Sequence, residues 1–334
     1  MSMESIVPSN TWSKRLTPLL TEAWWEARKQ ILTAPRTNAD EHVWLLEDPD
    51  HMGDPAQKVD QHMHQFAADG LHRAVPRIQV FGEEAPMSQL LLSNDFPYVA
   101  YLDAVDGSAQ AWALPGAWGH VIIVQQYQGV IAGEPYCPAR YIGVLDAEGG
   151  TTVFDAALPG VAVDMIDQMF EGGDVFDDEM VYYDDEAIFE VTKQPVLLVG
   201  GYKPTWWKRF AVLRERILHE WPKAQVFNTA GSPVTRKVIQ NGDNVVAQLT
   251  PSSLWDGAGA ALIAQAGGAV IPIGNSEPLP RDQILSWWSR LGYEPDPSSD
   301  GEKYRPALRI PPFVAGMKAE RVQVAARLCR DLPS

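Results

Sequence analysis

The stretch YVAYLDAVDGS, residues 98–108, joins a predicted strand to a turn that carries two carboxylates. Its β-branched and aromatic first half is typical of a buried strand. Asp103 and Asp106 follow, and the Gly107-Ser108 pair predicts a tight turn into a helix start, whose backbone N–H groups would face an anion. This arrangement predicts that a metal ion and a phosphate group meet at one place.

Three other segments place acidic residues at the end of a predicted strand or near the start of a predicted helix: Asp60, Glu83 and Asp256. Carboxylates that converge from separate segments suit Mg²⁺ or Mn²⁺, which prefer hard oxygen ligands to thiolates. Each of these acids, taken alone, is also a good helix cap or an ordinary solvated side chain. The pattern therefore leaves a metal site and a structural role both open.

Composition excludes several classes of function. The 334 residues include 27 Lys and Arg against 43 Asp and Glu, and the net charge of −16 argues against nucleic-acid binding, which depends mainly on basic side chains. The sequence has two cysteines, nothing resembling a signal peptide in residues 1–10, and no apolar run long enough to span a membrane. We therefore expect a soluble cytoplasmic protein with reduced thiols and no membrane partner.

The acidic charge is concentrated between residues 141 and 192, which contain fourteen Asp and Glu and no Lys or Arg. Such a run is either a site for a cation or a basic partner, or a solvated face or surface insertion. No glycine occupies the turn position of a calcium loop, so we favour the solubilising interpretation.

Hydrophobic periodicity predicts helices and strands in mixed order. Amphipathic helices are expected over 12–32 and from about residue 60 to before Pro76, and a small-residue helix over 257–266. From about residue 278 onward, prolines indicate a looser tail. This mixture is typical of an α/β or α+β layered fold. The expected strands are 78–81, 98–102, 121–125, 141–145, 196–199, 226–228 and 269–273.

The acidic motifs, taken in order, resemble the inositol monophosphatase superfamily of Mg²⁺-dependent, lithium-sensitive phosphatases, which includes bisphosphate nucleotidases and fructose bisphosphatases. The spacings of 23 residues from Asp60 to Glu83 and 20 from Glu83 to Asp103 match the family pattern, and the resemblance covers roughly residues 12–275. It implies an α-β-α-β-α sandwich with one lobe over 1–190 and a second over 191–334, and it suggests a homodimer. The motifs are Asp60-Gln61, Gly82-Glu83-Glu84, Asp103-x-x-Asp106-Gly107-Ser108 and Trp255-Asp256-x-Ala258-Gly259.

The resemblance also implies roles for individual residues. The backbone carbonyl of Val105 would be a metal ligand, and Asp60 would hold a weaker third site. Glu83, Asp106 and Ser108 would be the catalytic residues, with Glu83 and Ser108 positioning and deprotonating the attacking water. Two or three Mg²⁺ ions, or Mn²⁺ in their place, would be bound by the side chains of Glu83, Asp103, Asp106 and Asp256. Contacts to the substrate, a small phosphorylated metabolite, would come from Gly107, Ser108, Gly231, Ser232 and Asp256.

Three positions depart from the family pattern. Ala104 stands where proline is usual and does not fix its φ angle as proline would. Ser108 replaces a threonine, and Gln57 replaces another threonine three residues before Asp60. Ala104 and Gln57 motivate the alternative that the chain is a metal- or phosphate-binding regulatory protein with weakened catalysis.

One further position bears on the substrate. Inositol-type members have a glutamate seven residues before the aspartate of the Trp-Asp motif, and this chain has Leu249 there. We therefore expect a nucleotide 3′-phosphate or a sugar phosphate to be preferred over inositol 1-phosphate. Arg236 and Lys237 would either meet a second phosphate of the substrate or be ordinary solvated helix residues.

Overall fold

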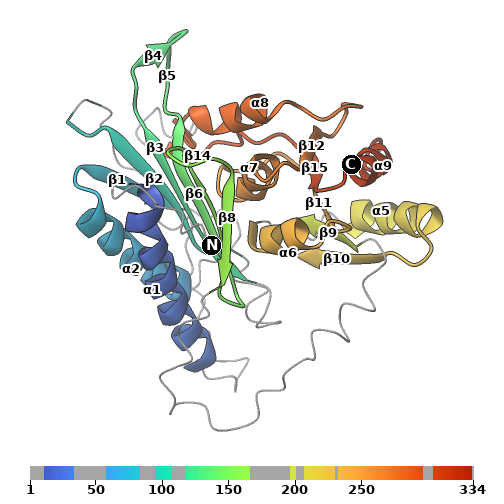
Figure 1. The fold of residues 1–334 in the computed structure, drawn as a ribbon, viewed down its shortest axis with the longest axis horizontal. Helices are drawn as coiled ribbons and strands as arrows, with labels where there is room; N and C mark the ends of the chain where they lie inside the picture. Colours follow the sequence, from blue (N-terminus) through green and yellow to red (C-terminus); the bar gives the residue numbers. More distant parts are fainter. Residues whose placement is uncertain are drawn as a thin grey trace, which may run out of the picture.

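Figure 1 shows the fold of the chain in a computed structural model. The structure describes residues 11–33, 58–82, 93, 95–106, 118–165, 196–200, 207–229, 232–295 and 304–332. Two sheets stand side by side in the view, with helices between them and on both outer sides.

The larger sheet has six strands in the order β1-β2-β3-β6-β7-β8. Strands β1 and β2 are parallel, and the other neighbours are antiparallel. A short hairpin of β4 (Val130–Ile131) and β5 (Glu134–Pro135) extends from the connection between β3 and β6. The sheet strands are β1 Ile78–Gly82, β2 Tyr98–Asp106, β3 Gly119–Gln126, β6 Ala139–Asp146, β7 Gly150–Asp155 and β8 Val161–Met165.

The second sheet has five strands in the order β10-β9-β11-β15-β12. The first three are parallel to one another, and β15 is antiparallel to both of its neighbours. A separate antiparallel pair joins β13 (Tyr293–Pro295) to β14 (Tyr304–Pro306). The sheet strands are β9 Val196–Gly200, β10 Gln225–Thr229, β11 Val245–Gln248, β12 Ala269–Pro272 and β15 Phe313–Gly316.

Helices lie between the two sheets and on both of their outer sides, so that helices and sheets together form five layers (Figure 1). Helices α1 (Trp12–Thr33) and α2 (Lys58–Ala74) cover the outer face of the six-stranded sheet, and α5 (Trp207–Glu220) and α9 (Ala319–Leu328) cover the outer face of the other. The short elements between the sheets are η3 Ser232–Val234, α6 Thr235–Gln240, α7 Ala258–Gln265, α8 Arg281–Leu285 and η4 Ser286–Ser289. The expected α-β-α-β-α sandwich is confirmed.

Alternation along the strands produces this layering, because successive side chains of a strand point to opposite faces. On β2, Val99 and Tyr101 pack toward the central helix layer, whereas Ala100 and Leu102 pack toward α1 and α2. Helix α7 contains only small or aliphatic residues and one glutamine, and all eight of its residues are buried. A helix that is apolar on every side fits between two sheets.

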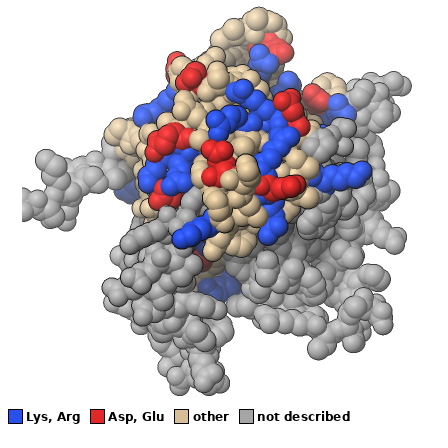
Figure 2. Space-filling model, turned by 90° about the vertical axis from the view of Figure 1, so that its right-hand side faces the viewer, with Lys and Arg blue, Asp and Glu red and all other residues tan. Residues whose placement is uncertain are grey.

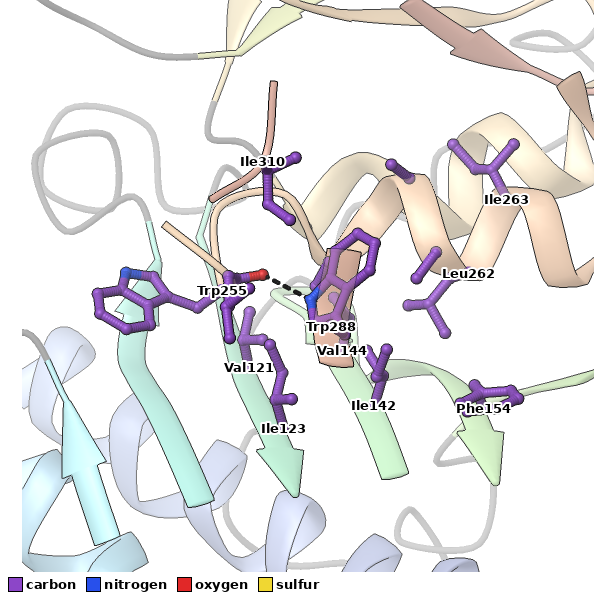
Figure 3. Close-up of a cluster of buried hydrophobic side chains, with 14 of the residues drawn as sticks. Val121, Ile123, Ile142, Val144, Phe154, Trp255, Leu262, Ile263, Trp288 and Ile310 are labelled. Atoms are coloured by element: carbon purple, nitrogen blue, oxygen red, sulfur yellow. Dashed lines mark hydrogen bonds between the residues drawn. The ribbon is translucent and has the colours of Figure 1, made fainter. Parts of the chain in front are cut away.

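The part of the chain expected to be a loose tail instead contributes to the central core. The Trp288 side chain is fully buried between strands of the larger sheet and α7, and its indole N–H donates to the Leu254 carbonyl over 3.1 Å (Figure 3). Strand β15 lies inside the second sheet, between β11 and β12. The prediction of a loose tail was wrong because the prolines at 278, 280 and 295 lie in connections and at a strand end, and not in these buried elements.

The solubilising interpretation of residues 141–192 is wrong for its first part. Strands β7 and β8 lie there, and β7 is buried along its whole length. Two of the acids in this part, Asp146 and Asp155, are themselves buried. The most acidic stretch, residues 171–190, lies outside the described residues, as does the boundary between the two expected lobes, which stays a prediction.

A buried ion pair joins α6 to the turn between β6 and β7. The Arg236 side chain is 9% exposed, and its Nε donates to Asp146 over 2.6 Å. Arg236 also pairs with Glu148, as does the exposed Lys237. Gly150 allows this approach, since a Cβ atom there would lie 2.0 Å from the arginine Nε. The suggested contact of these two basic residues with a second phosphate is therefore not supported, because both are engaged by carboxylates.

The surface over α5 and α9 carries basic and acidic side chains that are interspersed (Figure 2). Arg327 pairs there with Glu220 over 3.1 Å, and Lys318 with Asp243 over 2.8 Å. Exposed pairs of this kind contribute little to stability individually. They leave no single-sign patch on the described part of this face.

Replacing Arg236 by Met tests the buried ion pair. We expect Arg236→Met to lower the free energy of unfolding by about 3–5 kcal/mol, because it leaves the Asp146 carboxylate buried without its cation. The neighbouring Lys237→Met is the matched control and should cost less than about 1 kcal/mol, since that pair is half exposed. Urea denaturation of both variants gives the comparison, and equal losses would contradict it.

Candidate metal centre

Three carboxylates from two segments that are far apart in the sequence meet at one place in the fold. One oxygen each of Asp103, Asp106 and Asp256 lie within 4.8 Å of one another. The first two side chains are about 5% and 6% exposed, and Asp256 is partly buried. Asp103 and Asp106 come from the end of β2, and Asp256 comes from the turn that precedes α7.

The protein orients two of these carboxylates with hydrogen bonds. The backbone N–H of Ser232 donates to Oδ2 of Asp106 over 2.9 Å, and the hydroxyl of Ser253 donates to Oδ2 of Asp256 over 2.6 Å. The Ser232 hydroxyl in turn donates to the Trp255 carbonyl over 2.6 Å. Segment η3 therefore links the β2 end to the turn that carries Asp256, and the side chains are held in place before any ligand binds.

Aromatic packing also fixes the turn that carries Asp256. Trp255 is almost fully buried and packs against Tyr101 and Tyr293. The Tyr293 hydroxyl donates to the carbonyl of Gly82 over 2.6 Å, and the Tyr101 hydroxyl accepts the backbone N–H of Gly292 over 3.0 Å. Since Gly82 directly precedes Glu83, this network reaches the chain position of another predicted ligand.

The remaining predicted site residues fall into two groups. Val105 lies between the two aspartates on β2, and Asp60 is buried in the first turn of α2, outside the group of three carboxylates that meet. Ser232 has both its N–H and its hydroxyl donating within the protein. The roles proposed for all of these stay predictions. Glu83, Gly107, Ser108, Gly231 and Gln57 lie outside the described residues.

Two histidines near the centre were not predicted. The imidazole of His120 is fully buried, and its Nδ1 lies 2.8 Å from the carbonyl oxygen of Ala104. His64 on α2 is also buried, and its ring packs against Gly82, where a Cβ atom would lie 2.4 Å from its Nδ1. Burial lowers the pKa of both rings, that of His120 to about 4. An isolated histidine in an apolar run, such as GHVIIV, was the only signal in the sequence.

Comparison with known proteins supports the fold. No family model and no curated protein matches the sequence. Among solved structures, SuhB, the extragenic suppressor protein of Bartonella henselae, matches with a TM-score of 0.59 at 11% identity, over 95% of this chain and 98% of its own. The chain has the inositol monophosphatase fold. This confirms, for the fold, the resemblance that the acidic motifs indicated.

Two further solved structures with this fold also match the chain. An IMPase of Thermotoga maritima gives a TM-score of 0.55 at 12% identity, over 96% of this chain and 100% of that one. Inositol monophosphatase II of Staphylococcus aureus gives 0.51 at 15% identity, over 96% and 94%. At such low identity the likeness establishes the inositol monophosphatase fold, and the chemistry must be argued from the residues of this chain.

Replacing Asp106 by Asn tests the electrostatics of the centre. We expect Asp106→Asn to keep the fold, because the amide oxygen can still accept the Ser232 N–H. Without metal, the free energy of unfolding of this variant should be about 1 kcal/mol higher than that of the wild type, because one of three repelling charges is removed. Asp155→Asn is the matched control: this buried carboxylate accepts two hydrogen bonds from Ser13 and lies in the same sheet, outside the cluster. Asp155→Asn should lower the free energy of unfolding, because both carboxylate oxygens of Asp155 accept hydrogen bonds and the amide of asparagine can accept on only one.

Chemical denaturation in the presence of a chelator measures both variants. A loss of stability in Asp106→Asn as large as that in Asp155→Asn would contradict the view that the three carboxylates repel one another.

Proposed function

We propose that the protein is a divalent-metal-dependent phosphatase that hydrolyses a phosphomonoester of a small metabolite. The observation that carries this proposal is the convergence of three carboxylates from two distant segments at a preorganised, mostly buried place. The fold is consistent with it, since solved relatives in structure include proteins described as inositol monophosphatases. The protein from Staphylococcus aureus has been crystallised with inositol monophosphate and with 2′-AMP.

The donor set fits Mg²⁺ or Mn²⁺. Three carboxylates supply hard oxygen ligands, and Mg²⁺ is usually held by few carboxylates together with water and substrate phosphate. The described residues offer no cysteine or histidine within the same group. We propose that Asp103, Asp106 and Asp256 hold the ions, with Glu83 and the Val105 carbonyl beside them and Asp60 at a weaker third site.

The protein's own residues would then perform three tasks. Ser232 and Ser253 hold Asp106 and Asp256 in fixed orientations, so that no side-chain rearrangement is needed when the substrate binds. Glu83 and Ser108 would orient the attacking water, the Glu83 carboxylate would accept its proton, directly or through the Ser108 hydroxyl, and N–H groups at Gly107 and Ser108 would bind phosphate oxygens. A bound divalent ion would stabilise the negative charge that develops on these oxygens.

The substrate is proposed to be a nucleotide or sugar phosphate and not inositol 1-phosphate. Leu249 is 8% exposed and packs with Leu197 and Val199 in the apolar layer under α5 and α9. It offers no hydrogen bond to a ring hydroxyl, and an unpaired hydroxyl costs ~1–3 kcal/mol. Arg236 is held by Asp146 and Glu148, so selectivity for a second phosphate would have to come from other groups.

Phosphate release from a generic phosphomonoester tests the activity. We expect hydrolysis with Mg²⁺, none with excess chelator, and inhibition by Ca²⁺, which is larger and accepts more ligands, and by Li⁺. Asp106→Asn and Glu83→Gln should each remove most of the turnover, and Ser108→Ala less. A wild-type protein that binds Mn²⁺ but releases no phosphate from any substrate would favour the metal-binding regulatory alternative.

A comparison of substrates tests the choice within the class. We expect kcat/KM for inositol 1-phosphate to be at least tenfold below that for the best of 3′-phosphoadenosine 5′-phosphate and fructose 1,6-bisphosphate, a difference of about 1.4 kcal/mol in transition-state binding. A preference of the wild type for inositol 1-phosphate would refute the argument from Leu249.

A further inference from the structure

The two aspartates on β2 face one site because the strand is irregular between them. Asp103 pairs with Val121 of β3 and Asp106 pairs with Gly119, so two residues of β2 lie opposite the single residue His120. In a regular strand, residues three positions apart point to opposite faces of the sheet. One extra residue, a β-bulge, cancels this alternation and brings the two carboxylates to the same side.

The bulge lowers the stability of the fold unless its buried main-chain groups find other hydrogen-bond partners. Its extra residue leaves main-chain groups outside the regular ladder, and a buried carbonyl without a donor destabilises the fold. Ala104 lies in the bulge and is 0% exposed. Its carbonyl oxygen lies 2.8 Å from Nδ1 of His120, the residue directly opposite. A carbonyl only accepts, so Nδ1 must carry the proton and donate it.

Burial and this hydrogen bond together determine the charge and the tautomer of the ring. The His120 side chain is fully buried, and burial lowers its pKa to about 4, so that the ring is neutral near pH 7 and has a single N–H. With that proton on Nδ1, the other nitrogen, Nε2, is an acceptor, and it has no hydrogen-bond partner among the residues that the structure describes. The only N–H of a buried imidazole is thus used on the bulge of β2.

We propose that His120 is a positioning residue that holds the β2 bulge in the geometry that directs Asp103 and Asp106 at the same ion. The proposal rests on the metal-dependent function proposed above. Ala104 has no ring to fix its φ angle, so the imidazole supplies the constraint from the neighbouring strand.

Two substitutions separate positioning from packing. His120→Asn keeps an N–H donor close to the place of Nδ1, whereas His120→Leu has nearly the same shape and no donor. We expect the dissociation constant of Mn²⁺, measured by the loss of the free-ion electron paramagnetic resonance signal, to rise tenfold or more in His120→Leu. It should stay within about threefold of wild type in His120→Asn, because the amide N–H of that variant can still donate to the Ala104 carbonyl.

A control in the same strand accounts for general damage. Val124 is fully buried on β3, away from the bulge, and Val124→Ala should lower the unfolding temperature without changing the affinity for Mn²⁺. Equal affinities in the Leu and Asn variants would overturn the proposal for His120 alone. Failure of the wild type to bind Mn²⁺ would overturn the proposed function, and the positioning role with it.

Nuclear magnetic resonance of the wild type gives a test that does not depend on whether a variant folds. Long-range ¹H–¹⁵N spectra distinguish the two neutral tautomers of histidine, and we expect His120 to carry its proton on Nδ1, with slow exchange of that proton. A proton on Nε2 would overturn the proposal, because the ring would then have nothing to donate to Ala104.

Discussion

The close approach of the carboxylates of Asp103, Asp106 and Asp256 is the constraint around which the proposed site is organised. Their oxygens lie within 4.8 Å of one another, and like charges at this distance in a partly buried place oppose folding. Such a cluster persists only if the surrounding structure fixes it strongly. In the proposed function, a bound cation would offset this repulsion, so the arrangement would lower stability in the free protein and favour metal binding.

The surrounding layers provide the fixation. Helix α7, apolar on every side, is buried between the two sheets, and the turn that precedes it carries Asp256. Segment η3 reaches from the second half of the chain to Asp106, and the ion pair of Arg236 with Asp146 holds the adjoining helix α6 to the larger sheet. The centre therefore depends on contacts between parts of the chain more than 100 residues apart, such as the bond from Ser232 to Asp106.

Much of this could be predicted from the sequence, because local signals were strong. The first helix, the strand from Tyr98 and the small-residue helix before Gly267-Gly268 all have clear periodicity or turn chemistry, and they form within a few residues of the expected bounds. The acidic motifs directly indicated the carboxylates that meet. Strands β7 and β15 were missed because acidic neighbours and prolines, respectively, obscured short runs whose strand character comes from tertiary pairing.

The position of His120 could not be predicted, because nothing in an isolated histidine indicates which backbone atom it will face. The side chain lies opposite Ala104 only because β2 has one residue more than β3 between two paired positions. Bulges depend on the pairing of two strands and leave little trace in either strand alone. The same holds for Arg236, whose buried partner Asp146 lies in another part of the chain.

A crystal structure of the protein with Mn²⁺, measured at the manganese absorption edge, tests the central claim most directly. The account predicts an anomalous difference peak within coordination distance of oxygens of Asp103, Asp106 and Asp256, with these side chains oriented as in the free protein. A structure with Mn²⁺ in the crystal and no peak between the three carboxylates would contradict it.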